Sequence, residues 1–401
     1  MKPRFFRANC KKIVEKLDGG LLIVSGYHLV QRTNDMAYRF AQEANFWYLS
    51  GIEEPDWWLI VDGTRNKSWL VSSDIDEVHQ TFEGSLSHET AKKISGVDAV
   101  ISRDEAMTLF REQAKKHSVV YTIGEHPHKD HFNFIENSSQ KKMWALLERT
   151  FNAVQDCRKE LAQLRAIKQP EEIVAIKKAI RLTTDAFTIV KQKLPELKYE
   201  YEVEAEFDYY FKKHGASHAY DPIVASGKNA CTLHYEKNNT SLKKNSMLLM
   251  DVGARYEGYC ADITRTFIVG TATKRQIQVY GALEKAHYSI IKLLRPDVTV
   301  VDYSNSVDDI MKQTLLELGL IAQLDDDSGF RRYFPHAISH GLGVDVHDSL
   351  GAPDVFKEGM VLTVEPGIYI PKEGIGIRIE DNILITAQGH VNLSSSLSTG
   401  L

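Results

Sequence analysis

The chain has 401 residues, of which 43% are hydrophobic and 26% are charged, an ordinary balance for a globular protein in water. The formal net charge of −5 argues against nucleic acid or an anionic membrane as the main partner. The four cysteines form no CxxC pair, and no segment has the apolar core of a signal peptide or the length of a membrane span. We therefore expect a cytoplasmic protein with neither a disulfide framework nor a thiolate zinc site.

The first part of the chain predicts an α/β domain. Three short apolar runs have the length and composition of buried strands, namely GGLLIVSG, WWLIVDG and SVVYTIGE. Helical stretches separate these runs. We place the end of this domain near Cys157, which divides the chain into domains 1–157 and 158–401.

The second part predicts a mixed α and β domain with a strand-rich end. Residues 152–193 read as largely helical, and Pro170 occupies a favourable first-turn position. An apolar stripe follows Pro170 at helical spacing: Ile173, Ile176, Ile180 and Phe187. After Ala219 the pattern predicts strands and turns, interrupted by helices near 274–294 and 301–318.

Two aspartates occupy segments that otherwise read as buried strand. They are Asp251 and Asp262, in the stretch MLLMDVGARYEGYCADITRTF. A two-residue loop at Tyr256–Glu257 would place them directly opposite each other, with Cβ atoms about 4.5–5.5 Å apart. Two ionised carboxylates that close on an apolar sheet would repel each other and lose hydration. Either one of them is protonated or a cation lies between them.

A second acidic pair occurs near the C-terminus, in TVEPGIYIPKEGIGIRIEDN. A tight turn at Lys372–Glu373 would place Glu365 opposite Glu380. An acid in a strand is often only a sheet-end residue, and Glu380 could equally form an ion pair with Arg378. Two acid pairs and one histidine would instead suit two Mn²⁺, Co²⁺, Fe²⁺ or Zn²⁺ ions. Two such ions can polarise a carbonyl group for hydrolysis.

Four of the fifteen histidines lie in segments that could contribute to this site. His336, His340 and His347 share the stretch FPHAISHGLGVDVHD, and His234 lies in SGKNACTLHYEKN. A single histidine is usually polar surface or a structural hydrogen-bonding group. The glycines after His340 would let the backbone turn closely around a site, which favours a functional role when the acids are considered together with them.

These motifs together resemble the M24 "pita-bread" metallopeptidases, which include methionine aminopeptidase, aminopeptidase P and prolidase. The matching stretches are DVGARYEGYCADITRTF, HGLGVDVHD, TVEPGIYI and GIRIEDN. In addition, QRTNDMAYRFAQEANFWYLSGIEEPD is similar to the N-terminal domain of aminopeptidase P. The resemblance implies an α/β N-terminal domain of the creatinase/aminopeptidase P type, followed by an α+β pita-bread catalytic domain.

The resemblance also implies a set of metal ligands. Asp262 and Glu380 would bridge two divalent ions, most commonly Mn²⁺ in this branch. Asp251 would complete the shell of one ion, and His340 and Glu365 would complete the shell of the other. Glu365 would also carry the proton of the attacking water.

Further residues are implied to contact the substrate or to act in catalysis. His234 and His347 match histidines that contact the substrate or the tetrahedral intermediate. His336 matches another active-site histidine, and we expect His336 and His347 to line the pocket for the proline ring. Tyr369 matches a pocket residue, and Arg378 matches an arginine that braces the metal-binding carboxylates.

The activity that the resemblance implies is that of an Xaa-Pro aminopeptidase, acting on peptides with proline at the second position, in a homo-oligomer (dimer or tetramer). An Xaa-Pro dipeptidase is the alternative with the same chemistry. The segment QTFEGSLSHETAKK lacks the Trp and Arg that aminopeptidase P proteins often carry, which leaves the preferred substrate length open. A binding protein that has lost catalysis, or a metal-free creatinase type, is disfavoured because all five ligand positions are filled.

Overall fold

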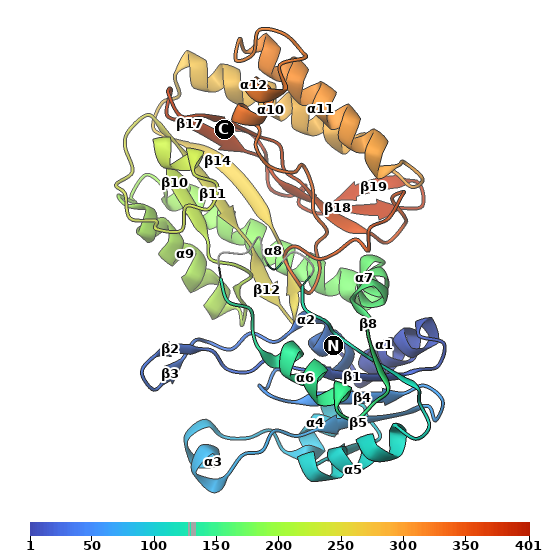
Figure 1. Ribbon diagram of the computed structural model, residues 1–401. Helices are drawn as coiled ribbons and strands as arrows, with labels where there is room; N and C mark the ends of the chain where they lie inside the picture. The colour runs from blue at the N-terminus through green and yellow to red at the C-terminus, as the bar shows by residue number, and fades with distance from the viewer. Residues whose placement is uncertain (127–128, 130–133) are drawn as a thin grey trace. The chain divides into compact units, whose positions relative to one another are not determined.

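The computed structural model describes residues 1–126, 129 and 134–401, and it divides into two compact units, Met1–Leu164 and Arg165–Leu401 (Figure 1). The division falls inside helix α7 (Arg158–Ala166), C-terminal to Cys157, where the sequence suggested the boundary. Each unit has a hydrophobic core of its own.

A six-stranded mixed sheet forms the centre of the first unit. Its spatial order is β6 (Ala99–Ile101), β5 (Lys67–Val71), β4 (Trp58–Asp62), β1 (Leu21–Ser25), β7 (Val119–Thr122) and β8 (Ala153–Asp156). Strand β4 runs antiparallel to β1 and β5, and the other neighbouring pairs are parallel. The three runs predicted as strands are β1, β4 and β7. Strand β8 lies in a stretch that we predicted to be largely helical, and that prediction was wrong there.

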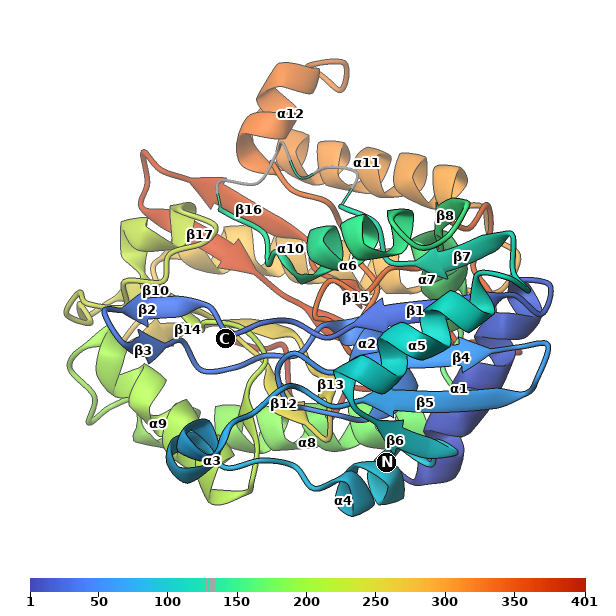
Figure 2. The same cartoon turned by 60° about the horizontal axis from the view of Figure 1, so that its bottom comes forward.

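Helices cover this sheet, and a small two-stranded hairpin extends from it. The covering helices are α1 (Pro3–Lys16), α2 (Ala44–Ser50), α4 (His88–Ser95), α5 (Arg103–Gln113) and α6 (Ser139–Glu148), and the hairpin is β2 (Gln31–Thr33) with β3 (Met36–Ala37). Helix α3 (Glu77–Glu83) has no buried residue and lies apart from the sheet (Figure 1). Figure 2 shows α5 crossing the sheet at β1 and β4. Phe110 of α5 and Leu147 of α6 pack with Leu21, Ile60 and Val120 of the sheet. Burial of these side chains stabilises the α/β arrangement that was predicted.

The second unit contains α8 (Pro170–Lys193), α9 (Glu200–Lys213), the short 3-10 helix η2 (Gly227–Cys231), α10 (Lys274–Ile291), α11 (Val300–Glu317) and α12 (Asp327–Tyr333). The predicted helices are α8, α10 and α11, whereas α9 and α12 were not predicted. In α8, Ile176, Ile180 and Phe187 are buried as the apolar stripe required. Among the described residues, no helix has the length and apolar character that a membrane crossing needs.

The strands of the second unit lie between α8 and α9 on one side and α10 and α11 on the other (Figure 1). They are β9 (Ser217–His218), β10 (Ile223–Ser226), β11 (Ser246–Val252), β12 (Ala254–Tyr256), β13 (Tyr259–Cys260), β14 (Ile263–Val269), β15 (Val361–Val364), β16 (Gly367–Ile370), β17 (Ile375–Arg378), β18 (Asp381–Thr386) and β19 (Gly389–Asn392). They form the groups β10-β11-β14, β13-β12-β9, β15-β18-β19 and β16-β17. This arrangement confirms the predicted α+β domain.

Candidate metal centre

The first acidic hairpin differs from the prediction by one residue in its loop. The turn lies at Glu257–Gly258, where φ is 47° and 84°, as a two-residue turn of type I′ requires. In the ladder of β11 with β14, Asp251 pairs with Thr264. The predicted direct opposition of Asp251 and Asp262 was therefore wrong. Asp262 lies two residues before Thr264, and since side chains two residues apart share a face of a strand, the two acids still face the same side.

The second acidic hairpin has the predicted register. Val364 pairs with Asp381 in the ladder of β15 with β18, and β16 pairs with β17 in the same register. This register places Glu365 opposite Glu380 between the two ladders. The connecting loop, residues 371–374, is centred on the predicted turn position.

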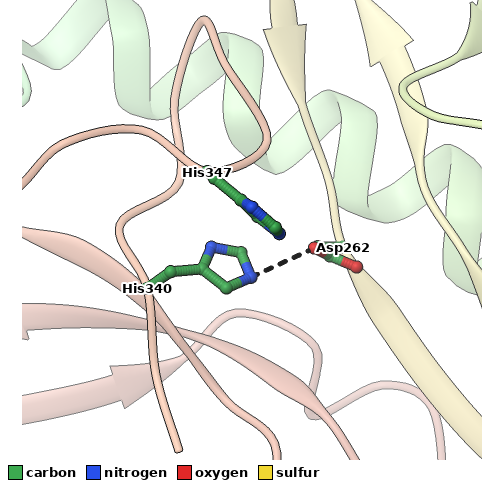
Figure 3. Close-up of side chains that lie close together, drawn as sticks. All are labelled: Asp262, His340 and His347. Carbon is green, nitrogen blue, oxygen red and sulfur yellow. Dashed lines mark ion pairs between the residues drawn. The ribbon is translucent and has the colours of Figure 1, made fainter. Parts of the chain in front are cut away.

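The two hairpins and the glycine-rich histidine segment bring the five predicted ligands together. Three overlapping groups have potential ligand atoms within 4.8 Å of one another: Asp251, Asp262 and Glu380; His340, Glu365 and Glu380; and Asp262, His340 and His347. The Nε2 atom of His340 lies 3.4 Å from Asp262 Oδ2 and 3.4 Å from Glu365 Oε1. Figure 3 shows the rings of His340 and His347 beside the carboxylate of Asp262.

The electrostatics of this cluster fit a bound cation. Burial and the neighbouring carboxylates raise the pKa of both Asp262 and Glu380, and burial raises the pKa of Glu365 to about 7. Burial lowers the pKa of His340, but the hydrogen bond and charge of Asp262 outweigh it and raise the pKa to about 9. The Oε1 atom of Glu380 is buried without a hydrogen-bond partner. A buried carboxylate oxygen without a donor is a position that a metal ion would satisfy.

Arg378 connects three groups around the carboxylates. Its Nη2 donates to Asp251, its Nε donates to Thr264 Oγ1 at 3.0 Å, and its Nη1 donates to the Tyr369 hydroxyl at 2.8 Å. The Thr264 hydroxyl in turn donates to Glu380 Oε2 at 2.6 Å. The guanidinium is buried and therefore holds these partners in a fixed arrangement.

The other predicted histidines surround this centre at different depths. The Nε2 atom of His336 lies 2.9 Å from the Tyr369 hydroxyl. His347 is exposed, and its ring centre lies 4.2 Å from that of His340. His234 is exposed as well. Burial lowers the pKa of both His336 and His347 to about 4. Leu233 and Tyr235, the neighbours of His234, pack against the buried cluster that contains Tyr369.

Tyr220 is a residue of this site that the sequence analysis missed. Its hydroxyl, which has one proton to donate, lies within hydrogen-bond distance of Asp251 and, at 2.5 Å, of Asp262 Oδ1. Burial and these two acids raise its pKa well above the usual range, which keeps the hydroxyl a donor. Tyr220 lies in the connection between β9 and β10, so no strand or helix periodicity pointed to it.

The sequence matches family models over both units. Residues 6–121 match the model described as aminopeptidase P, N-terminal domain. Residues 174–387 match the model described as metallopeptidase family M24. This chain belongs to metallopeptidase family M24. The matched residues 174–387 contain both acidic hairpins and His340.

Relatives of this M24 protein match nearly its whole length. The Xaa-Pro aminopeptidase of Escherichia coli K12 is 32% identical over 98% of this chain and 94% of the relative. The Xaa-Pro dipeptidase of Pyrococcus furiosus is 30% identical over 89% of this chain and 92% of the relative. The structure of E. coli aminopeptidase P with the inhibitor Pro-Leu superposes with a TM-score of 0.84 and 30% identity, covering 100% of this chain and 96% of that one.

Proposed function

We propose that this chain is an Xaa-Pro aminopeptidase, which hydrolyses the bond between the first residue of a peptide and a proline in second position. The observation that carries this proposal is the convergence of four carboxylates and His340 around an unsatisfied carboxylate oxygen. Full-length similarity to an Xaa-Pro aminopeptidase supports the substrate class.

Two divalent cations are part of the proposal, with Mn²⁺ preferred over Co²⁺, Fe²⁺ or Zn²⁺. The side chains that would hold them share one cluster: Asp251, Asp262, His340, Glu365 and Glu380. A donor set dominated by carboxylates with one imidazole suits these metals. When bound, such a pair polarises a carbonyl and supplies a hydrolytic nucleophile at neutral pH.

The chain's own residues are proposed to move protons and to place the substrate. Thr363 holds Glu365 Oε1 by a 3.0 Å hydrogen bond, which orients this carboxylate to accept the proton of the attacking water. The exposed rings of His234 and His347 are available to donate to charge that develops on the substrate. Arg378 keeps the carboxylates in place through its hydrogen bonds.

Recognition of the substrate has to rest on shape. An Xaa-Pro amide has no N–H, so it offers the site no donor at the scissile bond. His336 and Tyr369 are hydrogen-bonded to each other, and they are proposed to form, with His347, the pocket wall for the pyrrolidine ring.

The deciding experiment compares an Xaa-Pro dipeptide, an Xaa-Pro-Xaa tripeptide and an Xaa-Ala-Xaa tripeptide in the presence of Mn²⁺. The proposal expects cleavage of Xaa-Pro-Xaa and little cleavage of Xaa-Ala-Xaa. Cleavage of the dipeptide alone would favour a dipeptidase, the activity named for the P. furiosus relative. A metal-loaded protein inert toward every proline peptide would refute both activities.

A cytoplasmic homo-oligomer, either a dimer or a tetramer, completes the proposal. Neither nucleic acid nor a membrane is proposed as a partner, in keeping with the net charge of −5. Light scattering coupled to size-exclusion chromatography would measure the mass of the assembly directly. A mass equal to the 45.5 kDa chain at micromolar concentration would contradict the oligomer.

A further inference from the structure

A fully buried carboxylate outside the metal centre organises one segment of the second unit. Glu200, the first residue of α9, is buried and accepts five hydrogen bonds. Its Oε1 accepts from Ser226 N at 2.7 Å, Ser226 Oγ at 2.7 Å and Asn229 Nδ2 at 3.1 Å. Its Oε2 accepts from the Tyr235 hydroxyl at 2.9 Å and Thr240 N at 2.8 Å. The metal centre uses none of these groups.

All five donors belong to residues 226–240, which we call the His234 loop. The loop starts at the end of β10, includes η2, and carries His234 next to Tyr235. Leu233 and Tyr235, on either side of His234, both pack against the cluster of buried side chains that contains Tyr369. The loop is therefore held on one side by Glu200 and on the other by a side chain of the site.

We propose that Glu200 is a positioning residue that fixes the loop carrying His234 beside Tyr369 of the site, an inference that rests on the proposed peptidase function. Burial of a carboxylate is costly unless donors compensate for the lost water. Here the compensating donors all come from the His234 loop, so Glu200 can be buried only when the loop adopts this conformation. Hydrogen bonds to a charged acceptor are stronger than hydrogen bonds between neutral groups, so Glu200 holds the His234 loop strongly in this conformation.

The arrangement of donors predicts that glutamine cannot replace this glutamate. One carboxylate oxygen of Glu200 accepts the backbone N–H of Ser226, and the other accepts the backbone N–H of Thr240. A glutamine amide has only one acceptor oxygen. In either orientation its NH₂ group would face a backbone N–H, which cannot reverse its role as a hydroxyl can. One end of the His234 loop is then released.

The kinetic test uses the Mn²⁺-loaded full chain with an Xaa-Pro-Xaa peptide. Glu200→Gln is expected to lower kcat/KM by roughly 10- to 100-fold, the cost of a small displacement of a catalytic group. In a His234→Ala background the same substitution should have no further effect, because the group it positions is gone. Glu206→Gln is the matched control, since Glu206 also lies on α9 but bonds Lys193.

Either of two kinetic results would overturn the proposal. One is a Glu200→Gln protein with wild-type kcat/KM. The other is a Glu200→Gln, His234→Ala double variant whose loss of kcat/KM equals the product of the two single losses. Should Glu200→Gln fail to fold, Tyr235→Phe takes its place. This variant removes only the Tyr235 hydroxyl, which bonds Glu200 and also lies 3.2 Å from Asn239 Oδ1 and 3.2 Å from Thr240 Oγ1. It keeps the ring packed against the cluster that contains Tyr369. A smaller loss of kcat/KM is expected, again absent when His234 is alanine, and an unchanged kcat/KM would count against the proposal.

Amide hydrogen exchange tests the positioning without any activity. In Glu200→Gln the amides of Ser226 and Thr240 should exchange faster than in the wild type, while Glu206→Gln leaves them protected. Unchanged protection of both amides would overturn the proposal. A wild-type protein inactive toward all proline peptides would instead refute the proposed function, and the exchange result would still decide whether Glu200 holds the loop.

Discussion

Glu380 and Asp381 are neighbours in the chain and equally buried, yet their surroundings carry opposite charge. Burial and the adjacent Asp262 raise the pKa of Glu380. Asp381 points to the other side of the chain and accepts hydrogen bonds from Arg265 Nη2 at 2.6 Å and Asn392 Nδ2 at 2.6 Å. Although burial raises the pKa of Asp381, Arg265 outweighs burial and holds it below the usual range.

The difference separates a structural carboxylate from a functional one. Arg265 is fully buried, and it also donates to the backbone oxygens of Glu380, Leu397 and Ser398. It therefore connects residues 397–398 to Glu380 and Asp381. Asp381 is thereby neutralised from within the protein. Glu380 keeps an oxygen without a donor and needs a positive charge from outside.

Glu380→Gln should show the largest effect on activity. Loss of a residue proposed to bridge both cations removes several kcal/mol of transition-state stabilisation, so kcat/KM should fall by roughly 10³- to 10⁴-fold. The metal-free protein should become more stable at neutral pH, because one of several buried like charges is gone. Peptidase assays and urea unfolding in EDTA measure the two effects. Glu373→Gln, in an exposed ion pair with Arg275, is the control, and wild-type activity in Glu380→Gln would contradict the comparison.

Arg265→Met should show the largest effect on stability. It leaves Asp381 buried without its cation, which is expected to cost about 3–5 kcal/mol of unfolding free energy in urea titrations. The second substitution Asp381→Asn should restore part of this loss. Arg331→Met breaks the exposed pair with Asp308 and should cost no more than about 1 kcal/mol. Equal losses for the two arginines would remove the distinction between a buried and an exposed pair.

His336→Ala and His347→Ala should each lower kcat/KM toward Xaa-Pro-Xaa by about 100-fold, the loss expected when a side chain that places the substrate is removed. The unfolding free energy should change little, because both rings are at least partly exposed. His390→Ala serves as the control, since His390 bonds the carbonyl of Leu294 away from the carboxylates. A variant with an unchanged rate would remove that histidine from the proposed pocket.

Stabilisation by Mn²⁺ should depend on pH. The folded metal-free protein raises the pKa of Glu365 to about 7 and that of Asp262 as well, so it binds protons that the unfolded chain releases. Its stability therefore falls as pH rises from the unfolded pKa of these acids through 7, and it falls further through 9 because the pKa of His340 is raised to about 9. Cations need the deprotonated ligands. Mn²⁺ at 100 times its Kd at pH 8 should therefore add about 2.7 kcal/mol to the unfolding free energy at pH 8, and the same Mn²⁺ concentration should add much less at pH 5. Equal thermal shifts at both pH values would contradict this.

The parts of the fold that the sequence predicted are those with a repeating pattern. Strands β1, β4 and β7 are continuous apolar runs, and α8 shows an apolar stripe at helical spacing. Such local patterns identify an element as a strand or a helix without any knowledge of its contacts. The register of the second acidic hairpin was also predicted, because Glu365 and Glu380 are an odd number of residues apart, as a directly opposed pair with an even-length loop requires. The motifs, through the family that they resemble, also predict the five proposed ligands.

The first hairpin marks the limit of that reasoning. The loop falls at Glu257–Gly258, one residue later than predicted, because both positions need positive φ and glycine adopts it without strain. This single step turned a directly opposed pair of acids into a diagonal one. The two acids still lie on one face, because Asp262 is two residues from Thr264, the residue that pairs with Asp251.

The sequence by itself determined the elements with a strong apolar pattern, such as β1, β4, β7 and α8, and the side chains whose chemistry suits a metal, since both follow from local pattern and residue chemistry. Only the tertiary structure decided how each buried charge is balanced. Tyr220 reaches the aspartates from a loop, Arg265 gathers the chain end, and Glu200 collects donors from a segment more than 25 residues away. Such contacts involve single residues distant in sequence, so they leave no periodicity, and only folding brings donor and acceptor together.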